Sequence, residues 1–390
     1  MLLEGLHIPL TTPFHPDGRL HLSKLAANVG RYSKSPAAGL IVLGPSGEPT
    51  LLSDDETREV LSAAAEAAAP EKVLLAGVSR DGVRATLAFA DFAAELDYDT
   101  ILVGLPSILA TEAPAGTERS AQRLRELLTY FQTIADRSPI PLVLLNAGGI
   151  PIDAIAELAA HAHILGLLDA GPQGVQPSQI AEILRRTAAI QREVTVTPVF
   201  AAVTARMTKA AAAAWTPTFI SADTLAGTYS GMLAAVDGGV SSMLLAEPPD
   251  SAPPDSVPPD SVSPSLAQQG SAPLRTRKKT VGFQVLCGAA SALLDALRAG
   301  ATGIAPAFAA CAPQACYEVL AAWKDADQPL AEEKQARLQA AADLADDWAG
   351  ALKFACELNG YFGGLPRLPH LPPTGELRAQ MERLMEGMRN

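Results

Sequence analysis

The stretch HILGLLDAG, residues 163–171, is a short apolar run that ends on an aspartate and a glycine. Similar runs recur along the chain, and each is followed by an amphipathic stretch, which is typical of buried parallel strands joined by helices. We count eight of them: LHIPL, GLIVLG, KVLLAGV, TILVGLP, PLVLLNAG, ILGLLDA, FQVLCGA and TGIAPAFA. Eight strands that alternate with helices predict an α/β fold, a (β/α)8 TIM barrel.

One connection departs from this pattern. Between the helix that ends near Thr187 and the strand at Phe283 lie about 90 residues, whereas connections in α/β folds usually take about 2–6. The second part of this insertion repeats PPDS and has little apolar content, so we expect an extended, partly disordered linker. The first part, residues 194–246, is apolar and could add strands or a helix. Because the insertion leads from a helix back to a strand, we expect it on the N-terminal face, opposite the active sites of such barrels.

The expected organisation has four segments. They are residues 1–188 with the first six βα units, 189–281 with the insertion, 282–327 with the last two βα units, and 328–390 with a C-terminal helical extension. Helix starts are also readable in the sequence. Ser53 and Glu56 have the spacing of a capping box at the start of an alanine-rich helix.

Composition narrows the classes of partner. The 390 residues carry a formal net charge of -12, which disfavours nucleic acid because the phosphates would be repelled. No apolar run approaches the roughly 18 residues that span a bilayer, and the N-terminus lacks a secretory pattern, so we expect a cytoplasmic protein with no membrane partner. The four cysteines have no paired spacing, which indicates reduced, buried thiols.

Motifs for cofactors and metals are missing from the sequence. It has neither a P-loop nor a G-x-G-x-x-G fingerprint. His7, His161 and His163 do not form a ligand spacing with a third partner, so core or surface histidines are expected. We therefore expect no cofactor and no metal.

Short motifs in the first part of the chain carry a family resemblance. The first strand ends in Thr12–Phe14, an acidic turn follows at Asp17–Gly18, and the loop Gly44–Glu48 precedes the helix start at Leu52–Glu56. These motifs resemble the T-P-F, G-T-T-G-E and L-S-x-x-E patterns of the dihydrodipicolinate synthase and N-acetylneuraminate lyase family. The resemblance continues through the later strands and the C-terminal helices, except in the insertion. It implies a TIM barrel with a helical extension.

The resemblance also implies a chemistry. Members of that family hold a 2-oxo acid such as pyruvate as a Schiff base on a lysine of the sixth strand, and then make or break a carbon–carbon bond. In this chain the lysine position falls on Leu168, within Gly166–Ala170. The proton-relay tyrosine falls on Leu145, although Asn146 of the same motif is kept. A leucine can neither form an imine nor relay a proton.

Other family positions are changed as well. The first hydroxyl of the G-T-T-G-E loop falls on Pro45, and Ser46 keeps the second. The tyrosine pair after the fourth strand, which in the family reaches a neighbouring subunit, reads Ser107-Ile108, and the arginine after the fifth strand falls on Ile150. We therefore assign no catalytic residue.

The candidate ligand-binding residues are Ser46, Gly47, Glu48, Asn146 and Asp169. The first three could bind an anion through a glycine-permitted backbone approach, or could form a structural turn in which Glu48 contacts neighbouring amides. Asp169 could act as an acid or base in an apolar pocket, where desolvation would raise its pKa, or could simply be paired.

Two functional hypotheses follow. The favoured one is a divergent family member without pyruvate Schiff-base chemistry, which acts by ligand binding, assembly or altered catalysis. Its expected partners are a small 2-oxo acid or another small anion, and either a homo-oligomer or a hetero-oligomer with an active relative. The alternative is an active carbon–carbon lyase or aldolase with a relocated nucleophile. Lys209 would qualify if the insertion folds over the mouth of the barrel, while most other lysines, including Lys353, lie in patterns typical of solvated positions.

Overall fold

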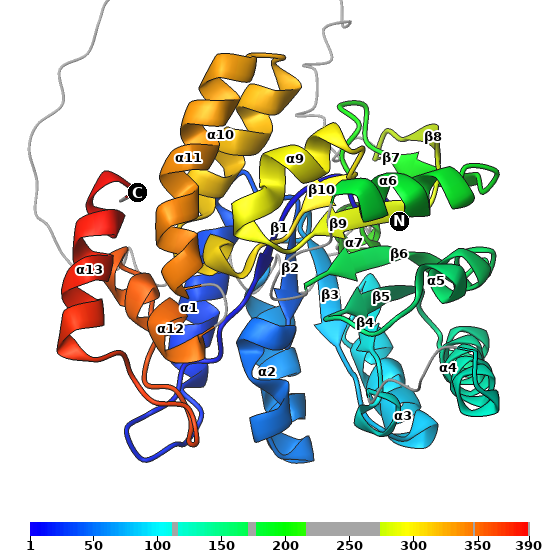
Figure 1. Cartoon of the computed structure of the whole chain (residues 1–390), viewed down its shortest axis with the longest axis horizontal. Helices are drawn as coiled ribbons and strands as arrows, with labels where there is room; N and C mark the ends of the chain where they lie inside the picture. The colour runs from blue at the N-terminus through cyan, green and yellow to red at the C-terminus, as the bar shows by residue number, and fades with distance from the viewer. Residues whose placement is uncertain (111–115, 171–176, 216–273, 346–347, 389–390) are drawn as a thin grey trace, which may run out of the picture. The chain divides into compact units, whose positions relative to one another are not determined.

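The computed structural model describes residues 1–110, 116–170, 177–215, 274–345 and 348–388. Eight parallel strands close into a barrel in the order β1-β10-β9-β6-β5-β4-β3-β2 (Figure 1). Their bounds are β1 Gly5–Pro9, β2 Gly39–Val42, β3 Val73–Gly77, β4 Thr100–Gly104, β5 Leu142–Asn146, β6 Ile164–Asp169, β9 Gln284–Cys287 and β10 Gly303–Ile304. The predicted (β/α)8 barrel is confirmed.

Helices follow the strands and cover the barrel (Figure 1). Those of the barrel are α1 Leu22–Ser33, α2 Asp54–Ala67, α3 Val83–Glu95, α4 Glu118–Arg137, α5 Ile152–Ala159, α6 Pro177–Arg186, α9 Leu293–Arg298 and α10 Pro313–Lys324. The C-terminal extension consists of α11 Gln328–Ala345, α12 Ala349–Leu358 and α13 Gly375–Met385, and α11 packs against α10.

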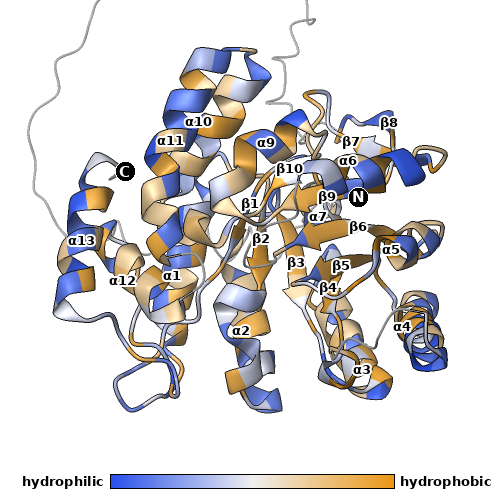
Figure 2. Ribbon diagram, viewed as in Figure 1, coloured by the Kyte–Doolittle hydropathy of each residue, from blue (hydrophilic) through white to orange (hydrophobic). Residues whose placement is uncertain are grey.

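The strands separate two apolar layers. Figure 2 shows the barrel strands as mostly hydrophobic and the outer surfaces of the surrounding helices as mostly hydrophilic. Successive side chains of a strand point to opposite faces, so Leu167 packs in the layer between the strands and the helices, while Leu168 packs inside the barrel. Because β6 is buried along its whole length, its sequence reads as a continuous apolar run.

The insertion begins and ends with an antiparallel ribbon, in which β7 Arg192–Val196 pairs with β8 Arg277–Val281. Arg192 donates to the carbonyl oxygens of Ala159 (2.6 Å) and His161 (2.8 Å), just before β6. Lys279 forms an ion pair with Glu4 at 2.7 Å, just before β1. The ribbon therefore lies on the N-terminal face of the barrel, as predicted.

Beyond β7 the insertion contains α7 Ala205–Trp215. Residues 1–208 with 275–390 form one compact unit, and residues 209–274 form a second. The structure describes only 209–215 and 274 of the second unit, so the PPDS repeat lies outside the described residues. The first part of the insertion, for which the sequence left strands or a helix open, thus contains β7 and α7.

Two further sequence expectations concern the whole chain. All four cysteines lie in the described part of the chain, are buried and form no disulfide, as their spacing predicted. Among the helices that the structure describes, none is both long and apolar enough to cross a bilayer.

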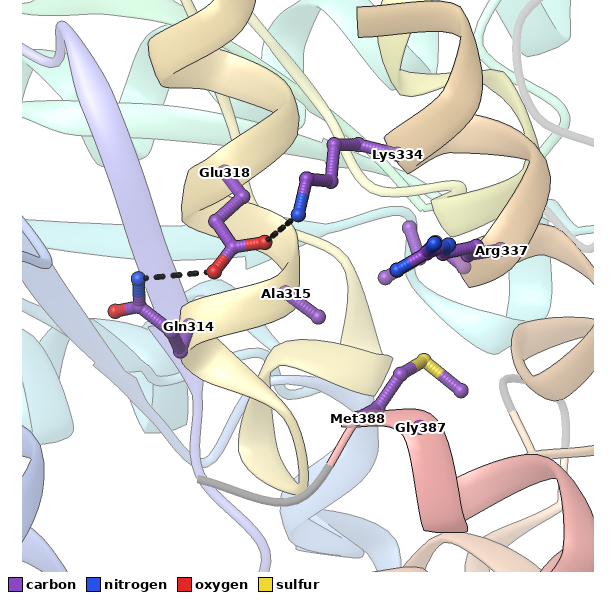
Figure 3. A pocket seen from close by; sticks show the side chains of 8 residues that line it. Gln314, Ala315, Glu318, Lys334, Arg337, Gly387 and Met388 are labelled. Atoms are coloured by element: carbon purple, nitrogen blue, oxygen red, sulfur yellow. Dashed lines mark hydrogen bonds and ion pairs between the residues drawn. The ribbon is translucent and has the colours of Figure 1, made fainter. Parts of the chain in front are cut away.

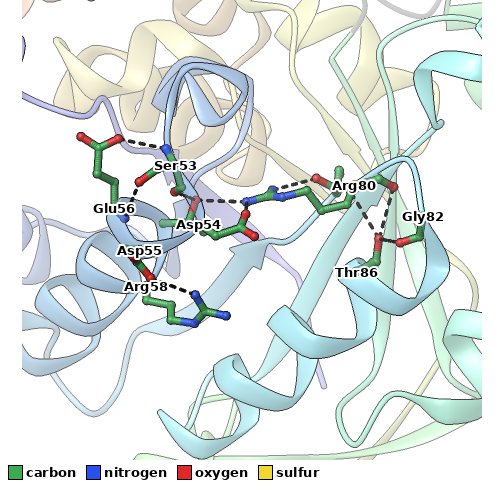
Figure 4. A network of polar contacts seen from close by, with 10 residues as sticks. Ser53, Asp54, Asp55, Glu56, Arg58, Arg80, Gly82 and Thr86 are labelled. Carbon is green, nitrogen blue, oxygen red and sulfur yellow. Dashed lines mark hydrogen bonds and ion pairs between the residues drawn. The ribbon is translucent and has the colours of Figure 1, made fainter.

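The predicted capping box at the start of α2 is present (Figure 4). The Ser53 hydroxyl accepts from the Glu56 amide at 3.2 Å, and the Glu56 carboxylate accepts from the Ser53 amide at 2.9 Å. The same carboxylate accepts two hydrogen bonds from the Arg367 guanidinium, at 2.6 and 2.8 Å. One side chain thus caps α2 and ties it to the C-terminal segment.

This arrangement predicts a pH-dependent contribution to stability. The Arg367 guanidinium lowers the pKa of Glu56 from its usual 4.5 to about 2. A lowered pKa means that the stabilisation is complete above pH 4.5 and disappears as the pH falls through 2. We expect Glu56→Gln, which keeps a capping oxygen, to lower the free energy of unfolding at pH 7 by about 1–3 kcal/mol. Urea unfolding between pH 7 and pH 2 should show a shallower acid loss in the variant, and parallel profiles would contradict this role.

Candidate functional site

A cavity of about 750 Å³ opens at the C-terminal ends of the barrel strands. Residues from β2, β3, β4, β5 and β6 and from the loops that follow them line it, together with residues of α11 and α12. This is the end of the barrel where enzymes of this architecture carry their active sites. Its volume is within the range of about 300–1,000 Å³ of small-molecule sites.

Two leucines on neighbouring strands form part of the cavity wall. Leu145 of β5 pairs in register with Leu168 of β6, and both line the cavity. Leu168 is only 2% exposed and packs in the interior cluster with Leu286 and Ala305. By the motifs of the sequence, the family's lysine and tyrosine positions fall on these two leucines, and both line the cavity.

The loop after β2 carries Ser46, Gly47 and Glu48. Ser46 and Glu48 line the cavity. The amide of Gly47 donates to the Gly44 carbonyl at 2.9 Å, and the amide of Glu48 donates to the Pro45 carbonyl at 3.2 Å, so the tight turn already uses both donors. Of the two alternatives for this loop, the described contacts match the structural turn more closely than a cradle for an anion.

Glu48 forms a buried ion pair that the sequence did not indicate. Its carboxylate contacts the Lys353 ammonium, and the two side chains are 2% and 0% exposed. The Lys353 ammonium also donates to the Leu365 carbonyl at 3.2 Å and lies 4.3 Å from the centre of the Phe14 ring. Burial lowers the pKa of Lys353, and the facing Glu48 carboxylate opposes that shift. The expectation that Lys353 is solvated was therefore wrong.

The backbone of this loop is held in an uncommon conformation. Leu43 and Glu48 have positive φ angles of 56° and 54°, in the left-handed region that larger side chains rarely occupy. Gly77 allows the loop to approach, because a Cβ there would lie 1.9 Å from the Leu43 carbonyl oxygen. Such strain is often retained at functional sites, where the surrounding contacts enforce it.

Asn146 and Asp169 are not among the residues that line the cavity. The Asn146 side chain accepts from the amides of Gly148 and Ile150, at 3.2 and 3.4 Å, and donates to the Asp169 carboxylate at 3.4 Å. Both side chains are buried, at 8% and 2% exposure. They hold the loop after β5 against β6, and the structure separates them from Ser46 and Glu48.

Two further positions that carry polar side chains in the family are occupied by isoleucines. Ile150, at the position of the family's arginine, is 6% exposed and packs in the layer between strands and helices. Ile108, at the position of a tyrosine that reaches a neighbouring subunit, is 75% exposed.

The histidines considered as metal ligands do not line the cavity. His7 is buried, its ring contacts the Leu3 carbonyl at 3.1 Å, and burial lowers its pKa to about 4. His161 pairs with Asp136 at 2.9 Å. Within the described ranges no three histidine, cysteine or acidic side chains come together as a metal-binding group.

A separate small pocket, of about 80 Å³, lies between α10, α11 and the C-terminal end (Figure 3). Glu318 forms an ion pair with Lys334 at 2.7 Å and accepts from Gln314 at 3.3 Å. Because the charges are already paired and the pocket is small, this site has no evident ligand.

Comparisons with known proteins give a consistent picture. The model of the dihydrodipicolinate synthetase family matches residues 2–188. A 4-hydroxy-tetrahydrodipicolinate synthase of Xanthomonas axonopodis pv. citri is 32% identical over 190 residues, which cover 47% of this chain and 58% of the relative. An L-threo-3-deoxy-hexylosonate aldolase of Hypocrea jecorina is 32% identical over 173 residues, which cover 42% of this chain and 52% of the relative. The matches thus span between half and two thirds of these relatives.

Solved structures share the fold over the whole chain. A dihydrodipicolinate synthase of Bacillus anthracis superposes with a TM-score of 0.67 at 17% identity and covers 100% of both chains. A prophage protein of the same family from E. coli K12, solved in complex with pyruvate, gives a TM-score of 0.67 at 18% identity and covers 100% of this chain and 99% of its own. At these identities the likeness concerns the fold alone.

Proposed function

Because residues 2–188 of this chain belong to the dihydrodipicolinate synthetase family, we propose that the barrel mouth still binds a small molecule but forms no imine with it. The observation that carries the proposal is the placement of Leu168. Its side chain faces the cavity at the family's lysine position and offers no amine to a carbonyl compound. Leu145 beside it offers no hydroxyl for proton transfer.

The alternative of a relocated nucleophile has little support among the described residues. None of those that line the cavity is a lysine. Lys353 is fully buried against Glu48, and Lys72 donates to the Ser35 and Ala37 carbonyls at the opposite end of the barrel. Lys209 lies in α7, whose first residues contact the N-terminal face of the barrel through Arg206 and Asp99.

Each candidate residue takes a distinct role in this proposal. Ser46 supplies a hydroxyl to the ligand, while Gly47 and Glu48 fix the loop that presents it. Asn146 and Asp169 fix the loop after β5 from behind. Assembly as a homo-oligomer, or with an active relative, and a cytoplasmic location stay predictions.

A ligand screen with a blocked cavity tests this proposal. Compounds that bind the folded state should raise the midpoint of thermal unfolding. At one hundred times its Kd, a ligand adds about 2.7 kcal/mol to the free energy of unfolding. Ala170→Trp should abolish the stabilisation, because Ala170 lines the cavity. Ala340→Trp, on an exposed position of α11, is the matched control and should leave it intact. Ligands that stabilise both variants equally would bind elsewhere and contradict the proposal.

A further inference from the structure

Few basic side chains line the cavity. Among the described lining residues the ionisable ones are Glu48, Asp343 and His370, and none is a lysine or arginine. The Glu48 charge is balanced by Lys353, whereas Asp343 is exposed. A carboxylate that enters this cavity would lose hydration without meeting a lysine or arginine on the described wall.

Basic side chains on the neighbouring loops are engaged elsewhere. Arg80, next to the lining residue Ser79, donates to the Asp54 carboxylate at 3.3 Å and the Thr57 hydroxyl at 3.1 Å (Figure 4). Arg123 donates to the carbonyl oxygens of Leu109 at 2.9 Å and Gly149 at 3.1 Å. Both guanidinium groups therefore stabilise loops of the mouth and do not line the cavity.

The internal segments outside the described ranges have no basic residue that could reach the cavity. Residues 111–115, 171–176, 216–273 and 346–347 contain no lysine or arginine in their sequence. Arg389 is the one basic residue outside the described ranges. Apart from Arg389, the segments outside the described ranges therefore have no lysine or arginine to bring to the cavity.

Much of the rest of the wall is apolar, and the cavity is larger than a 2-oxo acid requires. Leu43, Leu105, Leu145, Leu168 and Leu352 face the cavity, whose volume is about 750 Å³. Beside His370 at the mouth, Leu368 and Leu371 are 74% and 60% exposed. Isolated hydroxyl groups, such as those of Ser46 and Ser291, are the main polar features that a ligand would meet.

We infer that the natural occupant of the barrel mouth is a mainly apolar small molecule that carries no carboxylate or phosphate. This inference rests on the proposed ligand-binding function and departs from the expectation of a 2-oxo acid or another small anion. The apolar body would pack against the leucines, and a hydroxyl, carbonyl or amine end would meet the serine hydroxyls or Asp343. Burial of apolar surface would supply most of the affinity.

Three probes with one apolar body separate the effects of charge and shape. They are 2-naphthylmethanol, 2-naphthylmethylamine and 2-naphthoate, titrated at pH 7 into the full-length protein by calorimetry. We expect the alcohol and the amine to bind at least tenfold more tightly than the carboxylate, and Ala170→Trp to abolish the binding. In Leu145→Arg, which adds a cation to the wall, the affinity for 2-naphthoate should rise relative to that for the alcohol.

The outcomes distinguish this inference from the function on which it rests. If 2-naphthoate binds as tightly as the alcohol, and Ala170→Trp abolishes both, the mouth is a ligand site but its proposed charge preference is wrong. If no probe binds up to its solubility limit, or if Ala170→Trp leaves all binding unchanged, the ligand-binding function itself is contradicted. The Ala340→Trp control, on an exposed helix position, should behave as the wild type in every titration.

Discussion

Replacing Lys353 with methionine is expected to lower the free energy of unfolding by about 3–5 kcal/mol. The reason is the environment of its partner, since Glu48 is buried and would be left with an unpaired charge. The same substitution removes the contact of the ammonium with the Phe14 ring and the hydrogen bond to Leu365. Urea unfolding at pH 7, monitored by circular dichroism, measures the change.

Two controls isolate the ion pair. The double variant Glu48→Gln with Lys353→Met removes both charges, so it should recover much of the loss, to within about 1–2 kcal/mol of the wild type. Lys324→Met breaks an exposed pair with Glu4, where the distance is 3.2 Å, and should cost less than about 1 kcal/mol. A loss in Lys353→Met no larger than that of Lys324→Met would show that the pair does not stabilise the fold.

A lysine introduced at position 168 is expected to make the protein reactive towards pyruvate. Leu168→Lys should form an imine with pyruvate that borohydride converts to a stable adduct, whereas the wild-type protein should form none. The new amine would stand in an apolar cavity, where desolvation lowers its pKa and leaves part of it unprotonated and nucleophilic. Intact mass spectrometry detects the adduct, and peptide mapping should place it on residue 168.

The design of this test allows for a folding defect. Leu168→Met keeps the volume and apolar character of the side chain and should stay unlabelled. Leu145→Lys, on the neighbouring strand and facing the same cavity, provides a second amine if Leu168→Lys does not fold. If both lysine variants fold and neither is labelled, the cavity is not accessible to a 2-oxo acid at these positions.

The fold was predictable because its signals are local. Strands buried on both faces give apolar runs, and a capping box needs only Ser53 and Glu56 at the correct spacing. The position of the insertion followed from its direction, from a helix back to a strand, and the ribbon of β7 and β8 lies on the N-terminal face as expected. Residues 216–273 are not among those that the structure describes, so the disordered linker stays a prediction.

The candidate site was predictable in part. Matching Leu168 and Leu145 to family motifs placed both on the cavity wall. Because successive side chains of a strand point to opposite faces, Leu168 and Asp169 cannot both face the cavity, and Asp169 is not among its lining residues. The pairing of Glu48 with Lys353 joins residues at opposite ends of the chain, and no local pattern signals such a contact.

Reductive trapping with borohydride shows whether the barrel mouth forms an imine with a 2-oxo acid. The purified wild-type protein is incubated with pyruvate, and then with a panel of 2-oxo acids, each with borohydride, while an active relative is labelled in parallel. We predict an unchanged intact mass for this protein and a stoichiometric adduct on the relative. A stoichiometric adduct on this protein, mapped to any of its lysines, would contradict the account and identify the relocated nucleophile.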